Sequence, residues 1–316
     1  MKVLVVGLGA VGTVFSCFLK EHGHRVAGLE LEPVAEIIRR QGVRVTGIWG
    51  DHAAKLDELA TSAEQIPDRD FDLVIVTVKS FDTEQVVAQI AGVMGANTYV
   101  FLAQNGYGNY EAAARSVPEE KIILGRVIFG AETLGPGSSA VTVSADDLVL
   151  GSPKNLIDHR VLEGFAMMID DSGISARASE RVMEYVWGKI IYNLALNSLG
   201  AILEVNYGKL AEIEDSRILM NSIIRETFAI LKAMGQRTLW PDAEASIHDF
   251  YNRLVPATAA HHASMLQDIR RGRKTEIDAL NGAIVELGRK YGIATPVNEV
   301  VAALVRAKEN LVMQRN

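Results

Sequence analysis

The chain is short of cysteine, of basic charge and of long apolar runs, and each shortage argues against a class of protein. Its 316 residues include one cysteine, Cys17, so no disulfide forms within the chain and nothing points to an oxidising compartment. Lys and Arg total 32 against 39 Asp and Glu, a net charge of −7 that does not favour nucleic acid. No segment is expected to span a membrane, and the N-terminal apolar run lacks a signal-peptide cleavage site. We therefore expect a cytoplasmic protein that works on neither nucleic acid nor membranes.

What the chain does have is 48% apolar residues, enough for one large core or two moderate ones. In its first part short apolar runs alternate with helical patterns, which predicts an α/β fold with a parallel, doubly wound sheet. The runs expected to be strands are residues 2–6, 25–29, 71–78 and 98–102. Residues 121–151 predict antiparallel hairpin structure closing one edge of the sheet. Beyond this region only helical periodicity remains, so we expect an α/β domain over 1–178 and an all-α domain over 179–316.

The sequence G-L-G-A-V-G lies directly between the first predicted strand and a helix. Its three glycines permit a tight turn, close approach of the backbone to a pyrophosphate and close packing of helix on strand. The N-terminus of the following helix favours the anionic phosphates. The motif therefore predicts a Rossmann-type dinucleotide site, although a glycine turn without a ligand is the alternative. The expected cofactor-binding residues of this loop are Gly7, Leu8, Gly9, Ala10, Val11 and Gly12.

Two further predicted strands end in polar loops at the same edge of the sheet. Lys79 follows one of them, and Asn105, within Gln-Asn-Gly, follows the next. Because the carboxyl ends of parallel strands share one edge, we expect both residues to lie near the cofactor.

Three polar residues recur every four positions in the otherwise apolar segment V-W-G-K-I-I-Y-N-L-A-L-N. They are Lys189, Asn193 and Asn197. In a helix each four-residue step turns by about 40°, so the three side chains line one narrow stripe of a buried helix. An amine and two amides in such a stripe need polar partners.

Motifs along the whole chain resemble those of the ketopantoate reductases (2-dehydropantoate 2-reductases). They are, in order, G-L-G-A-V-G, V-K-S, Q-N-G, W-G-K-I-I-Y-N-L-A-L-N, S-M-L-Q-D, and R-K-T-E-I-D with its following N-G. The late motifs, in this order and spacing, are far more specific than a glycine loop. The resemblance implies NADPH-dependent reduction of the 2-oxo acid ketopantoate to pantoate, a step towards pantothenate and coenzyme A.

The resemblance also implies roles for individual residues. Hydride transfer to a ketone places negative charge on its oxygen, and Lys189 would supply the proton and the positive charge that this oxygen requires. Glu276 would help to orient the lysine and contact the substrate, as the second catalytic residue. The substrate-binding positions would be Asn105, Asn193, Asn197 and Ser264, and Lys79 and Asn105 would meet the cofactor. No metal site is expected.

Each of these roles has a structural alternative. Lys189 is able to extend from a packed helix to solvent, as lysines often do. In the alternative interpretation, Glu276 pairs with Arg273 or Lys274 at the surface. Ser264 is then an ordinary serine on a helix face.

The sequence departs from the family pattern at two places, which leaves the acyl group of the substrate open. Ser198 stands where relatives often have proline, and in V-N-Y-G-K-L Asn206 comes one residue early, with Tyr207 at the matching place. Reduction of another branched 2-oxo acid, a 3-hydroxy acid dehydrogenase and a non-catalytic dinucleotide-sensing protein are the alternative functions. For each catalytic alternative the substrate is a small molecule. The sequence does not decide whether the protein forms a homodimer.

The family resemblance favours NADPH as the cofactor, whereas the charges near the second predicted strand favour NADH. Relatives that use NADPH commonly carry a basic residue just past the second strand, whereas here Leu31 stands between Glu30 and Glu32. A carboxylate there suits the ribose diol of NADH and repels the 2′-phosphate of NADPH. Arg39 and Arg40, on the next helix, are able to restore the usual preference. Both cofactors remain open, with a weaker preference for NADPH than is normal for the family.

Overall fold

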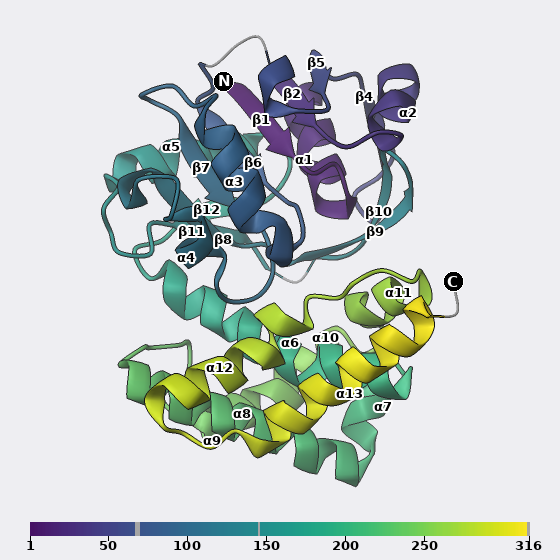
Figure 1. Ribbon diagram of the computed structural model, residues 1–316, viewed down its shortest axis with the longest axis vertical. Helices are drawn as coiled ribbons and strands as arrows, with labels where there is room; N and C mark the ends of the chain where they lie inside the picture. Colours follow the sequence, from purple (N-terminus) through teal and green to yellow (C-terminus); the bar gives the residue numbers. More distant parts are fainter. Residues whose placement is uncertain (67–69, 145, 315–316) are drawn as a thin grey trace. The chain divides into compact units, whose positions relative to one another are not determined.

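The structure is a computed structural model that describes residues 1–66, 70–144 and 146–314 (Figure 1). The chain divides into two compact units. An α/β unit comprises Met1–Gln104 and Asn109–Val182, and a helical unit comprises Asn105–Gly108 and Met183–Asn316. The sequence pattern changes at residue 179, close to the crossing between Val182 and Met183, but it gives no sign that the short segment 105–108 belongs with the helices.

The larger sheet of the α/β unit has, among the described residues, eight strands in the order β12-β11-β8-β7-β6-β1-β2-β5. Their bounds are β1 Lys2–Val6, β2 Arg25–Leu29, β5 Glu58–Ala60, β6 Leu73–Val76, β7 Tyr99–Leu102, β8 Ile122–Arg126, β11 Leu148–Gly151 and β12 Ala176–Ala178. All neighbours pair in parallel except β11 with β8. The predicted Rossmann-type doubly wound sheet is confirmed.

A second sheet in this unit has the order β4-β3-β10-β9 in the described part of the chain. Its strands are β3 Val43–Gly47, β4 His52–Ala54, β9 Phe129–Gly135 and β10 Ser138–Ser144. The antiparallel hairpin predicted for the edge of the main sheet does form, but it belongs to the other sheet. Strands β9 and β10 pair with each other, and β10 pairs with β3. The main sheet instead receives β11 as its antiparallel neighbour of β8.

Helices cover both faces of the main sheet, which is why its strands are almost uniformly apolar. The helices of this unit are α1 Ala10–Glu21, α2 Val34–Gln41, α3 Thr83–Ala91, α4 Asn109–Ala113 and α5 His159–Asp171. Residues of α1 and α5 share one core with alternate residues of β1, β6, β7 and β8. Helix α1 also contacts β3, β4 and β10, so it packs against both sheets. Figure 1 shows α3 in front of β6 and β7.

The helical unit is built around α6, Val182–Leu203. The other helices are α7 Tyr207–Glu212, α8 Glu214–Met234, α9 Ala243–Asp249, α10 Val255–Ala257, α11 Ser264–Arg270, α12 Asn281–Tyr291 and α13 Pro296–Met313. Contrary to the sequence expectation, α6 is long and apolar enough to cross a membrane by length and composition. Its most apolar 18-residue window is 72% buried within the structure, however, which is the environment of a core helix.

A buried chain of hydrogen bonds crosses the core of the helical unit. Ser198 on α6 donates to Asn281 of α12, Asn281 donates to Asn298 of α13 (2.9 Å), and Asn298 donates to Glu226 of α8 (2.7 Å). Ser198, Asn281 and Asn298 are 0% exposed. The serine that replaces the usual proline thus supplies a donor to a network joining four helices, and buried networks of this kind fix a single packing arrangement.

Candidate functional site

The glycine loop lies at the point where the strand order of the main sheet reverses. From β1 the chain runs through α1 to β2 on one side, whereas β6 pairs with β1 on the other. In open α/β sheets, ligands bind in the crevice outside the carboxyl ends of the strands at such a switch point. Gly7 follows β1 there, and a Cβ added to it would lie 2.8 Å from Val78 Cγ1, beyond the end of β6.

Two of the three glycines are required by crowding, and the third faces open space. Gly7 has φ +85°, and a Cβ on Gly12 would lie 1.9 Å from the Gly7 oxygen. At Gly9 a Cβ would meet nothing within 4 Å. Gly9 is also the N-cap of the 12-residue helix α1, and as a glycine it has no side chain to cap the helix. An open approach to the N-terminus of a helix fits the pyrophosphate of a dinucleotide.

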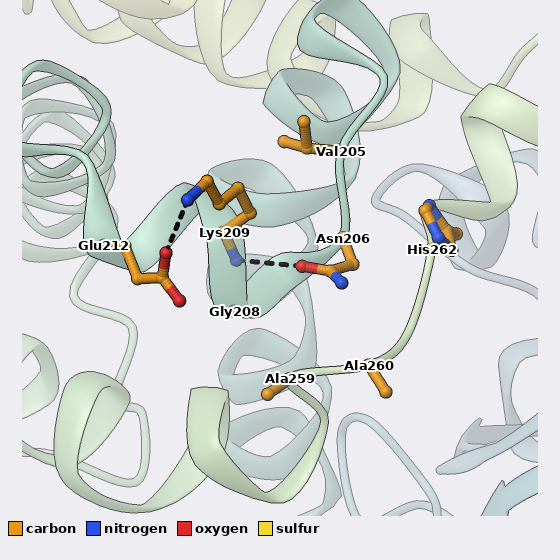
Figure 2. A pocket seen from close by; sticks show the side chains of 8 residues that line it. All are labelled: Val205, Asn206, Gly208, Lys209, Glu212, Ala259, Ala260 and His262. Atoms are coloured by element: carbon orange, nitrogen blue, oxygen red, sulfur yellow. Dashed lines mark hydrogen bonds and ion pairs between the residues drawn. The ribbon is translucent and has the colours of Figure 1, made fainter.

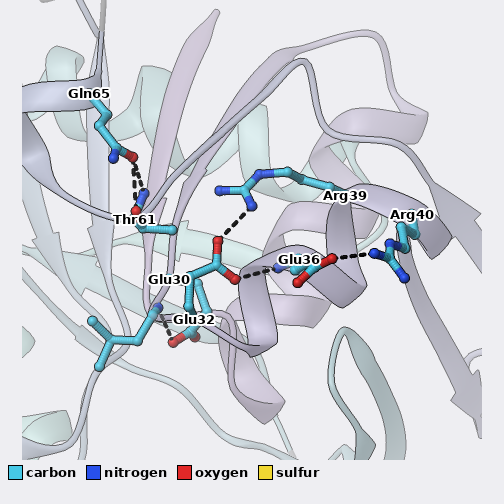
Figure 3. A network of polar contacts seen from close by, with 8 residues as sticks. Glu30, Glu32, Glu36, Arg39, Arg40, Thr61 and Gln65 are labelled. Carbon is cyan, nitrogen blue, oxygen red and sulfur yellow. Dashed lines mark hydrogen bonds and ion pairs between the residues drawn. The ribbon is translucent and has the colours of Figure 1, made fainter.

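The carboxylate of Glu30 lies beside this loop, at the end of β2. Its Oε2 accepts a hydrogen bond from the Leu8 backbone N–H at 2.6 Å, and its Oε1 accepts one from the Leu31 N–H at 2.8 Å. Glu32 instead pairs with Arg39 at 2.6 Å, as Figure 3 allows the reader to follow. Glu30 therefore contacts the glycine loop directly, through the Leu8 N–H, while Arg39 is engaged by Glu32.

The loops after β6 and β7 carry the two other residues predicted at this edge. Lys79 is half-buried and immediately precedes the short 3₁₀ helix Ser80–Asp82 of the α/β unit. Asn105 also is half-buried, but it belongs to the segment 105–108 of the helical unit. There the Tyr107 N–H donates to the Ala279 carbonyl at 2.8 Å. The structure therefore brings Asn105 into the same unit as Lys189 and Glu276, a grouping that the sequence did not predict.

The polar stripe of α6 is present as predicted by helical spacing. Lys189 is half-buried, Asn193 is 9% exposed and Asn197 is 5% exposed. The amide of Asn197 donates from Nδ2 to Ser264 Oγ at 3.2 Å and accepts from the Met265 N–H at 3.1 Å. Asn197 and Ser264 thus lie together at the first residue of α11, although they are far apart in sequence.

Glu276 is half-buried and sits just before the short 3₁₀ helix Ile277–Ala279. The preceding residue, Thr275, is 1% exposed, and both its N–H and its hydroxyl donate to Glu309 of α13, at 3.0 and 2.7 Å. A buried carboxylate therefore anchors the backbone that presents Glu276. Sequence reasoning missed Glu309, because it is a single acidic residue in a helix with no motif around it.

An open hollow of about 590 Å³ lies elsewhere in the helical unit (Figure 2). Its lining residues are Val205, Asn206, Gly208, Lys209, Glu212, Ala259, Ala260 and His262. Asn206 accepts from the Lys209 N–H at 2.9 Å as the cap of α7, and the Lys209 ammonium pairs with Glu212 at 2.8 Å. These groups bind one another, and none of the predicted catalytic residues lines the hollow. The shifted asparagine of V-N-Y-G-K-L is thus a helix cap.

Family models match most of the chain. The model described as "Ketopantoate reductase PanE/ApbA" matches residues 3–155, and the model described as "Ketopantoate reductase PanE/ApbA C terminal" matches residues 181–309. A 2-dehydropantoate 2-reductase of Aquifex aeolicus is 45% identical over 310 residues, covering 98% of this chain and 97% of that protein. A 2-dehydropantoate 2-reductase of Pyrococcus abyssi is 27% identical, covering 98% of this chain and 99% of that protein.

Solved structures give the same answer for the fold. A ketopantoate reductase from Ralstonia eutropha JMP134 has a TM-score of 0.85 and 28% identity, with 99% of each chain covered. A D-mandelate dehydrogenase in a ternary structure with NADH and anilino(oxo)acetate has a TM-score of 0.87 and 26% identity, again with 99% of each chain covered. With a 45% identical relative across nearly its whole length, the chain belongs to the ketopantoate reductase family.

Proposed function

We propose that this protein reduces ketopantoate to pantoate. The observation that carries the proposal is the stripe of Lys189, Asn193 and Asn197 on the buried helix α6, with Ser264 hydrogen-bonded to its last member. A bound nicotinamide dinucleotide supplies a hydride to C2 of the 2-oxo acid. The residues of this chain bind the acid, hold its ketone and deliver the proton that completes the alcohol.

Lys189 acts as the general acid. As the ketone carbon receives the hydride, its oxygen gains negative charge, and the lysine ammonium stabilises that charge and transfers a proton to it. The half-buried position of Lys189 strengthens this interaction, because an ammonium acts more strongly on a nearby charge where water is partly excluded.

The neighbouring polar residues bind the substrate. Asn193, one turn along α6 from Lys189, hydrogen-bonds polar groups of the substrate. Asn197 does the same together with Ser264, whose hydroxyl accepts a hydrogen bond from the Asn197 amide. Asn105 approaches from the segment 105–108, and Glu276 binds the hydroxyl end of the substrate and orients the lysine. The support for this arrangement is that all six side chains belong to one unit of the chain.

A comparison of 2-oxo acids tests the function. The purified protein is assayed with ketopantoate, with a phenyl-substituted 2-oxo acid of the mandelate type and, in the reverse direction, with 3-hydroxy acids. We expect the highest kcat/KM for ketopantoate. A higher kcat/KM for the aryl acid would show that the protein reduces a different 2-oxo acid. Activity with 3-hydroxy acids alone would contradict the proposed function.

We further propose that Glu30 binds the adenosine ribose diol, and that the enzyme prefers NADPH over NADH much less strongly than is normal for the family. The support is the position of the Glu30 carboxylate on the Leu8 N–H, with Arg39 engaged by Glu32. A 2′-phosphate beside Glu30 is a contact between like charges.

The Glu30→Gln substitution tests this cofactor proposal. We expect the ratio of kcat/KM for NADPH to that for NADH to rise by about tenfold or more, the effect of removing roughly 1.4 kcal/mol of repulsion. Glu36→Gln is the matched control, because Glu36 is an exposed carboxylate paired with Arg40 on α2. A hundredfold preference of the wild-type protein for NADPH would show that Glu30 does not set the choice.

Within this proposal the protein is a cytoplasmic biosynthetic enzyme acting on a small molecule. Its family relatives are named for the same reaction.

A further inference from the structure

The Q-N-G motif begins a short strap, Asn105–Gly108, that leaves the α/β unit, joins the helical unit and returns. Its two flanking residues, Gln104 and Asn109, belong to the α/β unit. They contact the same side chain there. Thr83 Oγ1 accepts from Gln104 Nε2 at 2.5 Å and donates to Asn109 Oδ1 at 2.8 Å. A single hydroxyl therefore ties both ends of the strap.

This hydroxyl is deeply buried. Thr83, the first residue of α3, is 0% exposed, and Asn109, the first residue of α4, is 3% exposed. The other polar atom of the Gln104 amide, Oε1, is buried and has no hydrogen-bond partner among the described residues. The contact with Thr83 is thus what orients this amide, and in a buried site a hydrogen bond of this kind strongly restrains both partners.

The strap itself fits closely against the helical unit. Gly106 has φ +85°, and a Cβ at this position would lie 2.6 Å from the Ala279 oxygen. The same Ala279 carbonyl accepts from the Tyr107 N–H, and Ala279 ends the turn that starts at Glu276. The Tyr107 ring packs on Trp187 of α6, with ring centroids 5.2 Å apart. The strap thus holds Asn105 in register with the turn of Glu276 and with the helix of Lys189.

We propose that Thr83 is a positioning residue for Asn105, acting through both ends of the strap. The substrate-binding role of Asn105 rests on the function proposed above, whereas the restraint of the strap by Thr83 does not. The three residues of the motif then have distinct roles, because Gln104 anchors the strap, Asn105 faces the substrate, and Gly106 allows close contact with Ala279.

A double-mutant cycle tests the proposal. Thr83→Val keeps the shape and removes the hydroxyl, and we expect kcat/KM for ketopantoate to fall by about tenfold to a hundredfold, the cost of a misplaced binding group. Dinucleotide affinity should fall less than kcat/KM, because the glycine loop is unchanged and only the expected contact of Asn105 with the cofactor is disturbed. In an Asn105→Ala background, Thr83→Val should cause little additional loss, since it acts through the residue already removed. Thr83→Ser, which retains the hydroxyl, should restore most of the activity.

Two comparisons separate positioning from general stability. Thr98→Val is the matched control, because Thr98 is 1% exposed and its hydroxyl donates to the Phe71 carbonyl at 2.6 Å in the same unit. It should lower thermal stability and leave kcat/KM unchanged. Hydrogen exchange of residues 105–108, measured without substrate, should accelerate in Thr83→Val and not in Thr98→Val.

Additive losses in the cycle, or exchange of the strap unchanged by Thr83→Val, would overturn the proposal. If the wild-type protein did not reduce ketopantoate, the proposed function would fail on its own. The exchange comparison would still decide whether Thr83 restrains the strap.

Discussion

At the scale of single residues, the proposed reaction depends most on Lys189. Removing a general acid usually lowers turnover by about a hundredfold to ten-thousandfold, and we expect Lys189→Ala to fall within that range. Dinucleotide binding should be nearly unchanged, because the lysine belongs to the helical unit and the glycine loop to the α/β unit. Steady-state kinetics and a titration with the reduced dinucleotide measure the two effects.

A matched substitution controls for loss of a positive charge. Lys209→Ala removes an exposed lysine of the helical unit that pairs with Glu212, and it should leave turnover unchanged. A Lys189→Ala enzyme retaining more than about a third of wild-type turnover would show that the lysine is not the acid.

Residue-scale prediction from sequence succeeded where a periodic pattern carried the information. The four-residue spacing of Lys189, Asn193 and Asn197 is enough to predict that they share one helix face. No such pattern indicates Glu309 or Thr83, whose importance comes from partners distant in the chain. Asp268 of α11 is likewise only 8% exposed, although a carboxylate on a helix is usually exposed to solvent.

At the scale of elements, the pair His52 and Glu21 links the second sheet to α1. His52 Nδ1 lies 2.6 Å from Glu21 Oε2, its Nε2 lies 3.0 Å from the Trp49 carbonyl, and its ring packs on Phe18. Burial of the ring opposes its charge, but the Trp49 carbonyl and Glu21 outweigh burial and raise the pKa of His52 above 6.5. The Glu21 pKa is lowered, since the hydrogen bonds from His52 and Ala53 outweigh its burial.

These pKa shifts predict a pH-dependent stability. A group whose folded pKa is raised contributes stability that is complete below its unfolded pKa and is lost as the pH rises through the folded value. The contribution of the His52–Glu21 pair to the free energy of unfolding should therefore fall by up to about 1 kcal/mol between about pH 6 and about pH 9. This is the limit for a partly exposed pair. The lowered Glu21 pKa keeps this carboxylate ionised throughout that window.

Denaturant unfolding at both pH values measures the effect. His52→Gln should remove this part of the pH dependence, and His248→Gln, an exposed position of the helical unit, should not. An identical pH profile for wild type and His52→Gln would contradict the assigned pKa direction.

Element boundaries were predicted well in the parallel sheet and less well in the hairpins. Residues 2–6 and 25–29 are strands as expected, because each is a short apolar run before a glycine or polar turn. The sequence of β9 and β10 indicates a hairpin but not which sheet it joins, since that depends on pairing with β3, far away in the chain. The apolar content of α6 was likewise underestimated, although its burial in the structure confirms the buried helix that the sequence predicted.

At the scale of the whole molecule, composition and motif order predicted an α/β unit followed by a helical one. They did not predict that the chain crosses between the units at residues 105–108. A four-residue segment has too little pattern of its own, and its partners Ala279 and Trp187 are reached only through the fold. The crossing unites Asn105 with the other proposed substrate residues, and so the site depends on a feature that only the structure reveals.

The central claim is that this chain transfers hydride from a nicotinamide dinucleotide to C2 of ketopantoate. The most direct test supplies ketopantoate together with NADH or NADPH in which both hydrogens at C4 of the reduced ring are deuterium, and analyses the product by mass spectrometry. We predict pantoate with one deuterium at C2, formed with either cofactor and far more slowly by the Lys189→Ala enzyme. Pantoate without the label, or label transferred only to other 2-oxo acids, would contradict the account.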